Sequence, residues 1–232
     1  MTKKYYIPKQ TREIVVSYCN NNIVPDKKYI ENPTHSHPIE WFKNYFGFID
    51  EISLRNHLAD AYYQARFLYK MMQGLRLTSF KKNAIIKFQI QQYASIYEAL
   101  IDFSLDKYRK SEVKELLKDV EYKPVNALAS NAEIHVKNKG RKERIYPCRK
   151  AERKNHLKTT RIDKRTQMGV DFGLLSEQTK QEFDKLYDIR NNIHILKAAK
   201  ANYKPSIKES TAAFNLMPTI TKELSEFIDK NK

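Results

Sequence analysis

The feature that most constrains the fold is an apolar stripe in the middle of the chain. Ile86, Ile90, Tyr93, Tyr97 and Leu100 are spaced by four, three, four and three positions, which is the repeat of one face of an α-helix. We therefore expect a central core helix within roughly residues 80–108. An earlier stripe with the same spacing predicts a second helix ending near Gly74, and its members are Leu54, Leu58, Ala61, Ala65, Leu68 and Met72.

Shorter signals predict further helices on both sides of these two. Pro38 suits the first turn of a helix, because the N–H that proline lacks is not needed there. Ser176 is a favoured residue at the start of a helix, and Glu177 suits the first turn. The expected segments are about 38–45, 112–117, 176–200 and 210–230, the last with a kink at Pro218. Residues 1–36 contain several prolines and an asparagine run that look irregular, and are expected to form an N-terminal arm or a segment of short elements.

Composition agrees with a helical fold. Hydrophobic residues make up 41% of the 232 residues, and only 5 are glycine, which favours packed helices over a turn-rich β architecture. The fold class we predict is all-α or mainly α, an antiparallel helical bundle with a small basic β-hairpin/helical insertion. The expected divisions are the N-terminal arm at 1–36, the first part of the bundle at 37–129, the insertion at 130–170 and the second part of the bundle at 171–232.

The insertion differs in pattern from the rest of the chain. Polar and apolar residues alternate over 133–137 and again over 143–146, on either side of Asn138-Lys139-Gly140. Strict alternation on both sides of a turn sequence predicts a short β-hairpin.

Positive charge gathers in the same insertion. The chain carries 43 Lys or Arg against 27 Asp or Glu, a net charge of +16, and thirteen of these basic residues fall between 137 and 165 with only three acidic ones. Such a patch binds a phosphate backbone by releasing counterions. The predicted nucleic-acid-binding residues are Lys137, Lys139, Arg141, Lys142, Arg144, Arg149, Lys150, Arg153, Lys154, Lys158, Arg161, Lys164 and Arg165.

Other interpretations of the charge stay open. An acidic lipid surface is one alternative, although the segment lacks the long apolar face of a helix that lies on a membrane. A solvated insertion that only keeps the protein soluble is another. If nucleic acid is the ligand, Tyr146 and His156 are candidates to stack on exposed bases.

A second candidate site lies on the predicted helix over 176–200. Arg190 and His194 are one turn apart and fall within its apolar stripe, while Asn191 lies on the edge of that stripe. A buried charge needs a partner, so Arg190 is expected to meet a carboxylate, another chain or a ligand phosphate. Glu51 and Glu98 are the intramolecular candidates for that partner.

These residue types suit RNA cleavage by a neighbouring 2′-hydroxyl. Histidine titrates near neutrality and can move the proton, while an arginine fork can hold the extra negative charge of the transition state. Asn191 would position the phosphate or the imidazole, and the scheme requires no metal. A structural hydrogen-bond network between Arg190 and His194 is the alternative.

Two segments resemble HEPN domains. Residues 174–200, which include Asp188-Ile189-Arg190-Asn191-Asn192-Ile193-His194, resemble the last core helix of that family, and Tyr93–Leu100 is similar to the preceding one. The resemblance covers roughly residues 50–200 and leaves out the basic insertion and the N-terminal arm. Only three residues separate Arg190 from His194, which is shorter than the usual motif of the family.

The resemblance implies a small helical bundle and a metal-independent endoribonuclease without cofactor. Arg190 and His194 would be catalytic and Asn191 supporting, at the interface of a homodimer. Family members act in toxin–antitoxin, abortive-infection and CRISPR systems, so an inhibitory antitoxin or a defence partner would be expected. The alternative is a non-catalytic RNA- or DNA-binding module or an interaction subunit, in which the Arg–His pair is structural.

The remaining features point away from other classes. No run of about 18 apolar residues exists, and the first ten residues lack an apolar signal segment. Two isolated cysteines do not make a disulfide framework or a zinc cluster. We therefore expect a cytoplasmic protein without a metal site and without a membrane partner.

Overall fold

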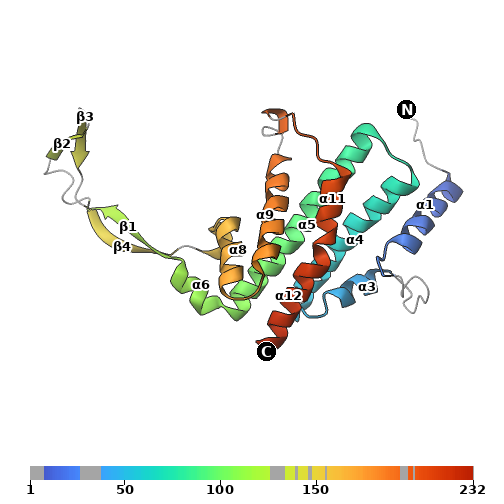
Figure 1. Ribbon diagram of the computed structural model, residues 1–232, viewed down its shortest axis with the longest axis horizontal. Coiled ribbons are helices and arrows are strands. Elements are labelled where there is room, and N and C mark those ends of the chain that lie inside the picture. Colours follow the sequence, from blue (N-terminus) through green and yellow to red (C-terminus); the bar gives the residue numbers. More distant parts are fainter. Residues whose placement is uncertain are drawn as a thin grey trace, which may run out of the picture.

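The structure is a computed structural model that describes residues 8–26, 38–125, 134–138, 141–145, 148–154, 156–193, 198–200 and 202–231. For 119–121, 124, 134–138, 141–145 and 152–154 it describes the backbone alone. Helices packed side by side form the body of the molecule, and paired strands project from one end of it (Figure 1). The predicted mainly α fold is therefore confirmed.

The two predicted stripes form the centre of the bundle. Helix α4 (Ile52–Gly74) and helix α5 (Ser79–Tyr108) are joined by a short turn and run antiparallel along each other (Figure 1). All five residues of the α5 stripe are buried. Because α5 also contacts α8, α9, α11 and α12, its sequence needs apolar residues on most of its circumference.

The last third of the chain packs against α5 as three helices, α9 (Glu177–Asn192), α11 (Ile207–Asn215) and α12 (Met217–Lys230). The side-chain oxygen of Ser176 accepts a hydrogen bond from the Thr179 N–H, so the predicted start of α9 is confirmed. Helix α11 begins before the expected position 210, because Ser206 and Glu209 form a reciprocal capping box there. The helical path breaks at Leu216, two residues before Pro218.

The N-terminal arm was predicted wrongly in part, because residues 9–22 are helical. Helix α1 (Lys9–Asn22) starts directly after Pro8 and packs on α4. The guanidinium of Arg66, a buried side chain on α4, donates a hydrogen bond of 3.0 Å to the Ile23 carbonyl at the end of α1. Pro8 precedes the helix and Pro25 follows it, so neither proline interrupts the period. Helix α3 (Pro38–Tyr45) begins at the proline, as predicted.

The projecting strands form two antiparallel pairs. Strand β1 (Lys118–Pro124) follows helix α6 (Lys110–Leu116) and pairs with β4 (Cys148–Lys154). Strands β2 (Ile134–Asn138) and β3 (Arg141–Ile145) form the predicted hairpin, at the end that lies farther from the bundle (Figure 1). We call the β1–β4 pair the ribbon. It was not predicted, and it begins at Lys118 instead of near 130.

The chain returns from the ribbon through the short 3-10 helix η1 (Leu157–Thr159) to helix α8 (Ile162–Asp171), which packs on α5 and α9. Residues 162–170 therefore belong to the bundle and not to the insertion. None of the helices that the structure describes combines the length and the apolar character required to cross a membrane.

Candidate functional site

The predicted basic cluster divides into groups by its place in the fold. Lys137, Arg141, Lys142 and Arg144 lie on β2 and β3, while Arg149, Lys150, Arg153 and Lys154 lie on β4. Lys158 lies on η1, Arg161 at the start of α8, and Lys164 and Arg165 within α8. Lys139 lies outside the described residues, as does Tyr146.

Four of these cations are exposed and form no ion pair in the described part of the chain. They are Arg149 and Lys150 on β4, Lys158 on η1 and Lys164 on α8. We call these four residues the basic track. Arg161 is exposed too, but its guanidinium is bound to the neighbouring Asp163 carboxylate at 3.1 Å.

Arg165 was predicted wrongly as a nucleic-acid contact. Its side chain is only 7% exposed, and its guanidinium forms ion pairs with Glu98, at 2.6 Å, and with Asp102. The two carboxylates lie one turn apart on α5, so the fork of the arginine reaches both. Arg165 therefore holds α8 against α5, and Glu98 is the partner of Arg165 and not of Arg190.

A second contact holds α8 against α9. The buried Thr166 hydroxyl is 3.1 Å from an Asp184 carboxylate oxygen, and Lys180 binds the other oxygen of that carboxylate at 2.8 Å. With Arg165 on the other side, α8 is attached to two helices of the bundle. The root of the ribbon is therefore fixed by buried polar contacts and does not depend on loop structure alone.

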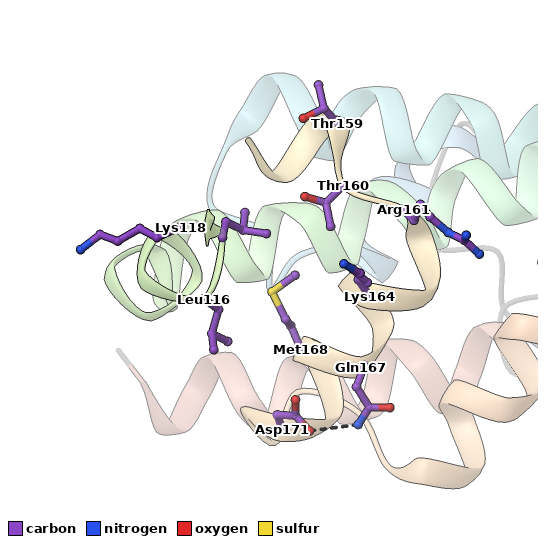
Figure 2. Close-up of a pocket in the computed structure, with 10 residues that line it drawn as sticks. Leu116, Lys118, Thr159, Thr160, Arg161, Lys164, Gln167, Met168 and Asp171 are labelled. Atoms are coloured by element: carbon purple, nitrogen blue, oxygen red, sulfur yellow. Dashed lines mark hydrogen bonds between the residues drawn. The ribbon is translucent and has the colours of Figure 1, made fainter. Parts of the chain in front are cut away.

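A cavity of about 610 Å³ lies at this root, between the end of α6, η1 and α8 (Figure 2). Lys118, Arg161 and Lys164 are the cations that line it, beside Thr160. Figure 2 shows the Lys118 and Arg161 side chains extending in opposite directions, with Lys164 between them. The charges do not converge on one point, and Lys118 and Arg161 already pair with Glu115 and Asp163, so the cavity does not form a focused site for a small anion.

The ribbon carries an exposed aromatic residue that the sequence reasoning missed. Tyr122 is 70% exposed, and its partner directly across the ladder is Lys150. Residues opposite each other in an antiparallel pair point to the same face, so ring and ammonium group share one side of the ribbon. The alternation of Val120 and Tyr122 with charged neighbours was the signal for this strand.

Arg190, the first member of the other predicted site, is half-buried in the last turn of α9. Its guanidinium lies 4.8 Å from the centre of the Tyr187 ring, and one of its nitrogens donates a hydrogen bond of 2.8 Å to the Tyr187 hydroxyl. No carboxylate among the described residues pairs with it. The charge of Arg190 is thus placed over an aromatic face and is not neutralised by an acid in that part of the chain.

The structure describes only one of the other two members of that predicted site. His194 lies outside the described residues, so its position on the same face as Arg190 remains a prediction. Asn191 lines a separate recess of about 540 Å³ together with Asp163, Asp184 and Asp188. These carboxylates make the recess less favourable for a phosphate group, although Arg161, which also lines it, pairs with Asp163, and Lys180 pairs with Asp184.

The fold and these sites define a helical-bundle protein that carries a basic two-stranded ribbon. No protein-family model matches the chain, and the searches of curated proteins and of solved structures found no match either.

Proposed function

We propose that this protein binds nucleic acid, with RNA as the first candidate, along the basic track formed by Arg149, Lys150, Lys158 and Lys164. The observation that carries the proposal is that these four cations are exposed and unpaired in the described part of the chain. In the same stretch of sequence, Arg165 is buried and bound to two acids. The four exposed cations are therefore available to a ligand, whereas Arg165 stabilises the fold.

Physical chemistry favours a polyanion as the ligand of such a surface. Exposed cations on a two-stranded ribbon repel one another, and a phosphate backbone removes that repulsion while it releases its own counterions. Because the ribbon is anchored to the bundle at its root, that end loses little conformational freedom on binding. The entropic cost of binding is therefore smaller. The expected result is affinity that falls steeply with salt.

Changing all four track residues to alanine tests the proposal. We expect the slope of log affinity against log salt to fall by up to about 3, since each lost phosphate contact on a single strand removes about 0.7. Fluorescence anisotropy with a labelled RNA, titrated at several salt concentrations, measures this slope. The matched control changes the exposed residues Lys81, Lys204, Lys208 and Lys230 to alanine, which lowers the net charge equally. Equal slopes for both variants would contradict the proposal.

RNA cleavage at α9 is the second candidate function. It is favoured by the charge of Arg190, which no acid neutralises in the described part of the chain. It is further supported by the resemblance to HEPN domains, because the two segments that carry the resemblance are neighbours: the rings of Tyr97 on α5 and Phe183 on α9 lie 6.1 Å apart. In this proposal two copies of the chain form a metal-independent endoribonuclease of the toxin or anti-phage type, with Arg190 and His194 as its catalytic groups.

The cleavage proposal is tested separately from binding. We expect RNA to be cut in the presence of a chelator, and Arg190→Ala and His194→Ala each to abolish cutting while RNA affinity persists. Arg161→Ala is the control, since this exposed arginine already pairs with Asp163. Unchanged cutting by both the Arg190 and the His194 variant, or no cutting by the unaltered protein, would contradict the cleavage proposal and leave the binding proposal intact.

A further inference from the structure

We infer that the ligand of the ribbon presents unpaired bases, and that Tyr122 stacks on one of them. This inference rests on the proposed nucleic-acid binding and names its substrate class. Tyr122 is 70% exposed, and no ring or cation packs against it in the part of the chain that the structure describes. A base can therefore lie flat on its ring without displacing any contact of the fold.

The charges around Tyr122 complete the arrangement. Lys150 lies directly opposite Tyr122 in the ladder, and Arg149 directly precedes Lys150 on β4. Adjacent strand residues point to opposite faces, so one cation shares the face of the ring and the other lies behind it. In single-stranded nucleic acid each base is followed by a phosphate, so a ring beside a cation matches the chemistry of one nucleotide.

A paired duplex fits this surface less well. The bases of a duplex already stack on each other, and an aromatic side chain reaches their faces only by unstacking a step. In A-form RNA the major groove is also too deep and narrow for side chains to read. A single strand offers both its phosphates and its base faces without that cost, so it satisfies the ring and the cations together.

Exposure alone does not carry this inference, because isolated exposed apolar residues are common. Phe80, at the start of α5, is 88% exposed and thus exceeds Tyr122. The basic track includes no residue of α5, however, whereas Tyr122 pairs across the ladder with Lys150 of that track. The position of the ring directly across the ladder from a residue of the track is what distinguishes Tyr122. Phe80 therefore provides a control for the loss of an exposed ring.

The experiment compares one short RNA of mixed sequence, without self-complementarity, with the same RNA annealed to its complement. We expect the intact protein to bind the single strand more tightly than the duplex at equal salt. Tyr122→Ala should weaken single-strand binding by about tenfold or more and leave duplex binding nearly unchanged. Tyr122→Phe keeps the stacking surface and should retain the preference, as should Phe80→Ala.

The possible outcomes distinguish base stacking on Tyr122 from nucleic-acid binding in general. If Tyr122→Ala keeps the preference, or the intact protein binds duplex and single strand equally, the stacking inference is overturned. Nucleic-acid binding still stands in that case, provided that the four-residue track variant loses affinity for both forms. If the intact protein binds neither form, both ideas fail. A preference lost in Tyr122→Ala and kept in Tyr122→Phe supports the inference.

Discussion

Arg149 and Arg165 come from the same basic stretch of sequence and end in opposite environments. Arg149 lies exposed on the ribbon and forms no ion pair in the described part of the chain, whereas the side chain of Arg165 is 7% exposed and bound to two carboxylates. None of the ribbon side chains that the structure describes is buried, while the bundle offers a pair of acids on α5. The difference shows that a count of positive charges overstates the surface available to a ligand.

The same contrast separates stability from function. Removing a buried guanidinium from its acidic partners costs several kcal/mol, so the fold itself accounts for Arg165. An exposed cation contributes little to folding and repels its neighbours. The exposed cations of the ribbon are therefore available to a ligand, and the stability of variants in each region tests this division.

The largest effect is expected for Arg165→Ala. The substitution removes the guanidinium that binds both Glu98 and Asp102, whose side chains are only 24% and 27% exposed. We expect the free energy of unfolding to fall by about 3 kcal/mol, with a drop in Tm of about 10 °C. Urea denaturation and calorimetry measure both quantities.

Arg161→Ala is the matched control for that loss. The Arg161 side chain is 82% exposed and its pair with Asp163 lies in solvent, where an ion pair contributes between zero and about 1 kcal/mol. If both arginine variants lose the same stability, the distinction between the buried and the exposed cations is wrong.

The sequence predicted the bundle well because apolar periodicity reports burial directly. The stripes of α4 and α5 gave both helices nearly to their ends, and Pro38 and Ser176 marked two starts. The later capping box at Ser206 was overlooked, although its Ser-x-x-Glu pattern is a known start signal. Local signals therefore sufficed for these helix starts, but not for the N-terminal arm, where α1 lies between two prolines.

Pairings between distant residues were not predictable in the same way. Glu98 was considered as a partner of Arg190, because a helical wheel shows which face a residue occupies but not which helix covers it. Strand β1 was missed since its partner β4 lies far along the chain and neither strand is strongly apolar. The burial of Arg165 was not predictable, because it depends on where α8 packs and on which residues lie next to it.

Arg190 should give an intermediate effect, because its environment lies between the two extremes. It is half-buried and pairs with the Tyr187 ring and hydroxyl, with no acid involved in the described part of the chain. We expect Arg190→Ala to cost about 1 kcal/mol of unfolding free energy, the sum of a weak cation–π contact and a hydrogen bond. Tyr187→Phe removes only the hydroxyl and should cost less. A loss as large as that of Arg165→Ala would place Arg190 among the structural charges.

The contributions of a largely buried acid, Asp102, and an exposed acid, Asp50, to the free energy of unfolding should change with pH in opposite directions. Burial raises the pKa of Asp102 above its ordinary 3.8, although Arg165 donates to it. Its contribution to stability is therefore full below pH 3.8 and is lost as the pH rises through its folded-state pKa. A hydrogen bond from Lys107 lowers the pKa of the exposed Asp50. That contribution is present above pH 3.8 and is lost as the pH falls through the folded-state pKa.

Unfolding free energies of Asp102→Asn and Asp50→Asn, each compared with the unaltered protein across acidic to neutral pH, check these signs. The stability advantage of the unaltered protein over Asp102→Asn should shrink as pH rises, and its advantage over Asp50→Asn should grow. Slopes of the same sign for both pairs would refute the assignment of a buried and an exposed acid.

The smallest change in stability is expected on the ribbon itself. Arg149→Ala combined with Lys150→Ala removes two exposed cations that form no ion pair in the described chain, so the free energy of unfolding should change by less than about 0.5 kcal/mol. Any gain would come from relieved repulsion along β4. RNA affinity at low salt should fall in the same variant, because the two lost phosphate contacts are not replaced. A variant that unfolds more easily yet binds RNA as before would reverse the division, since Arg149 and Lys150 would then serve the fold as Arg165 does.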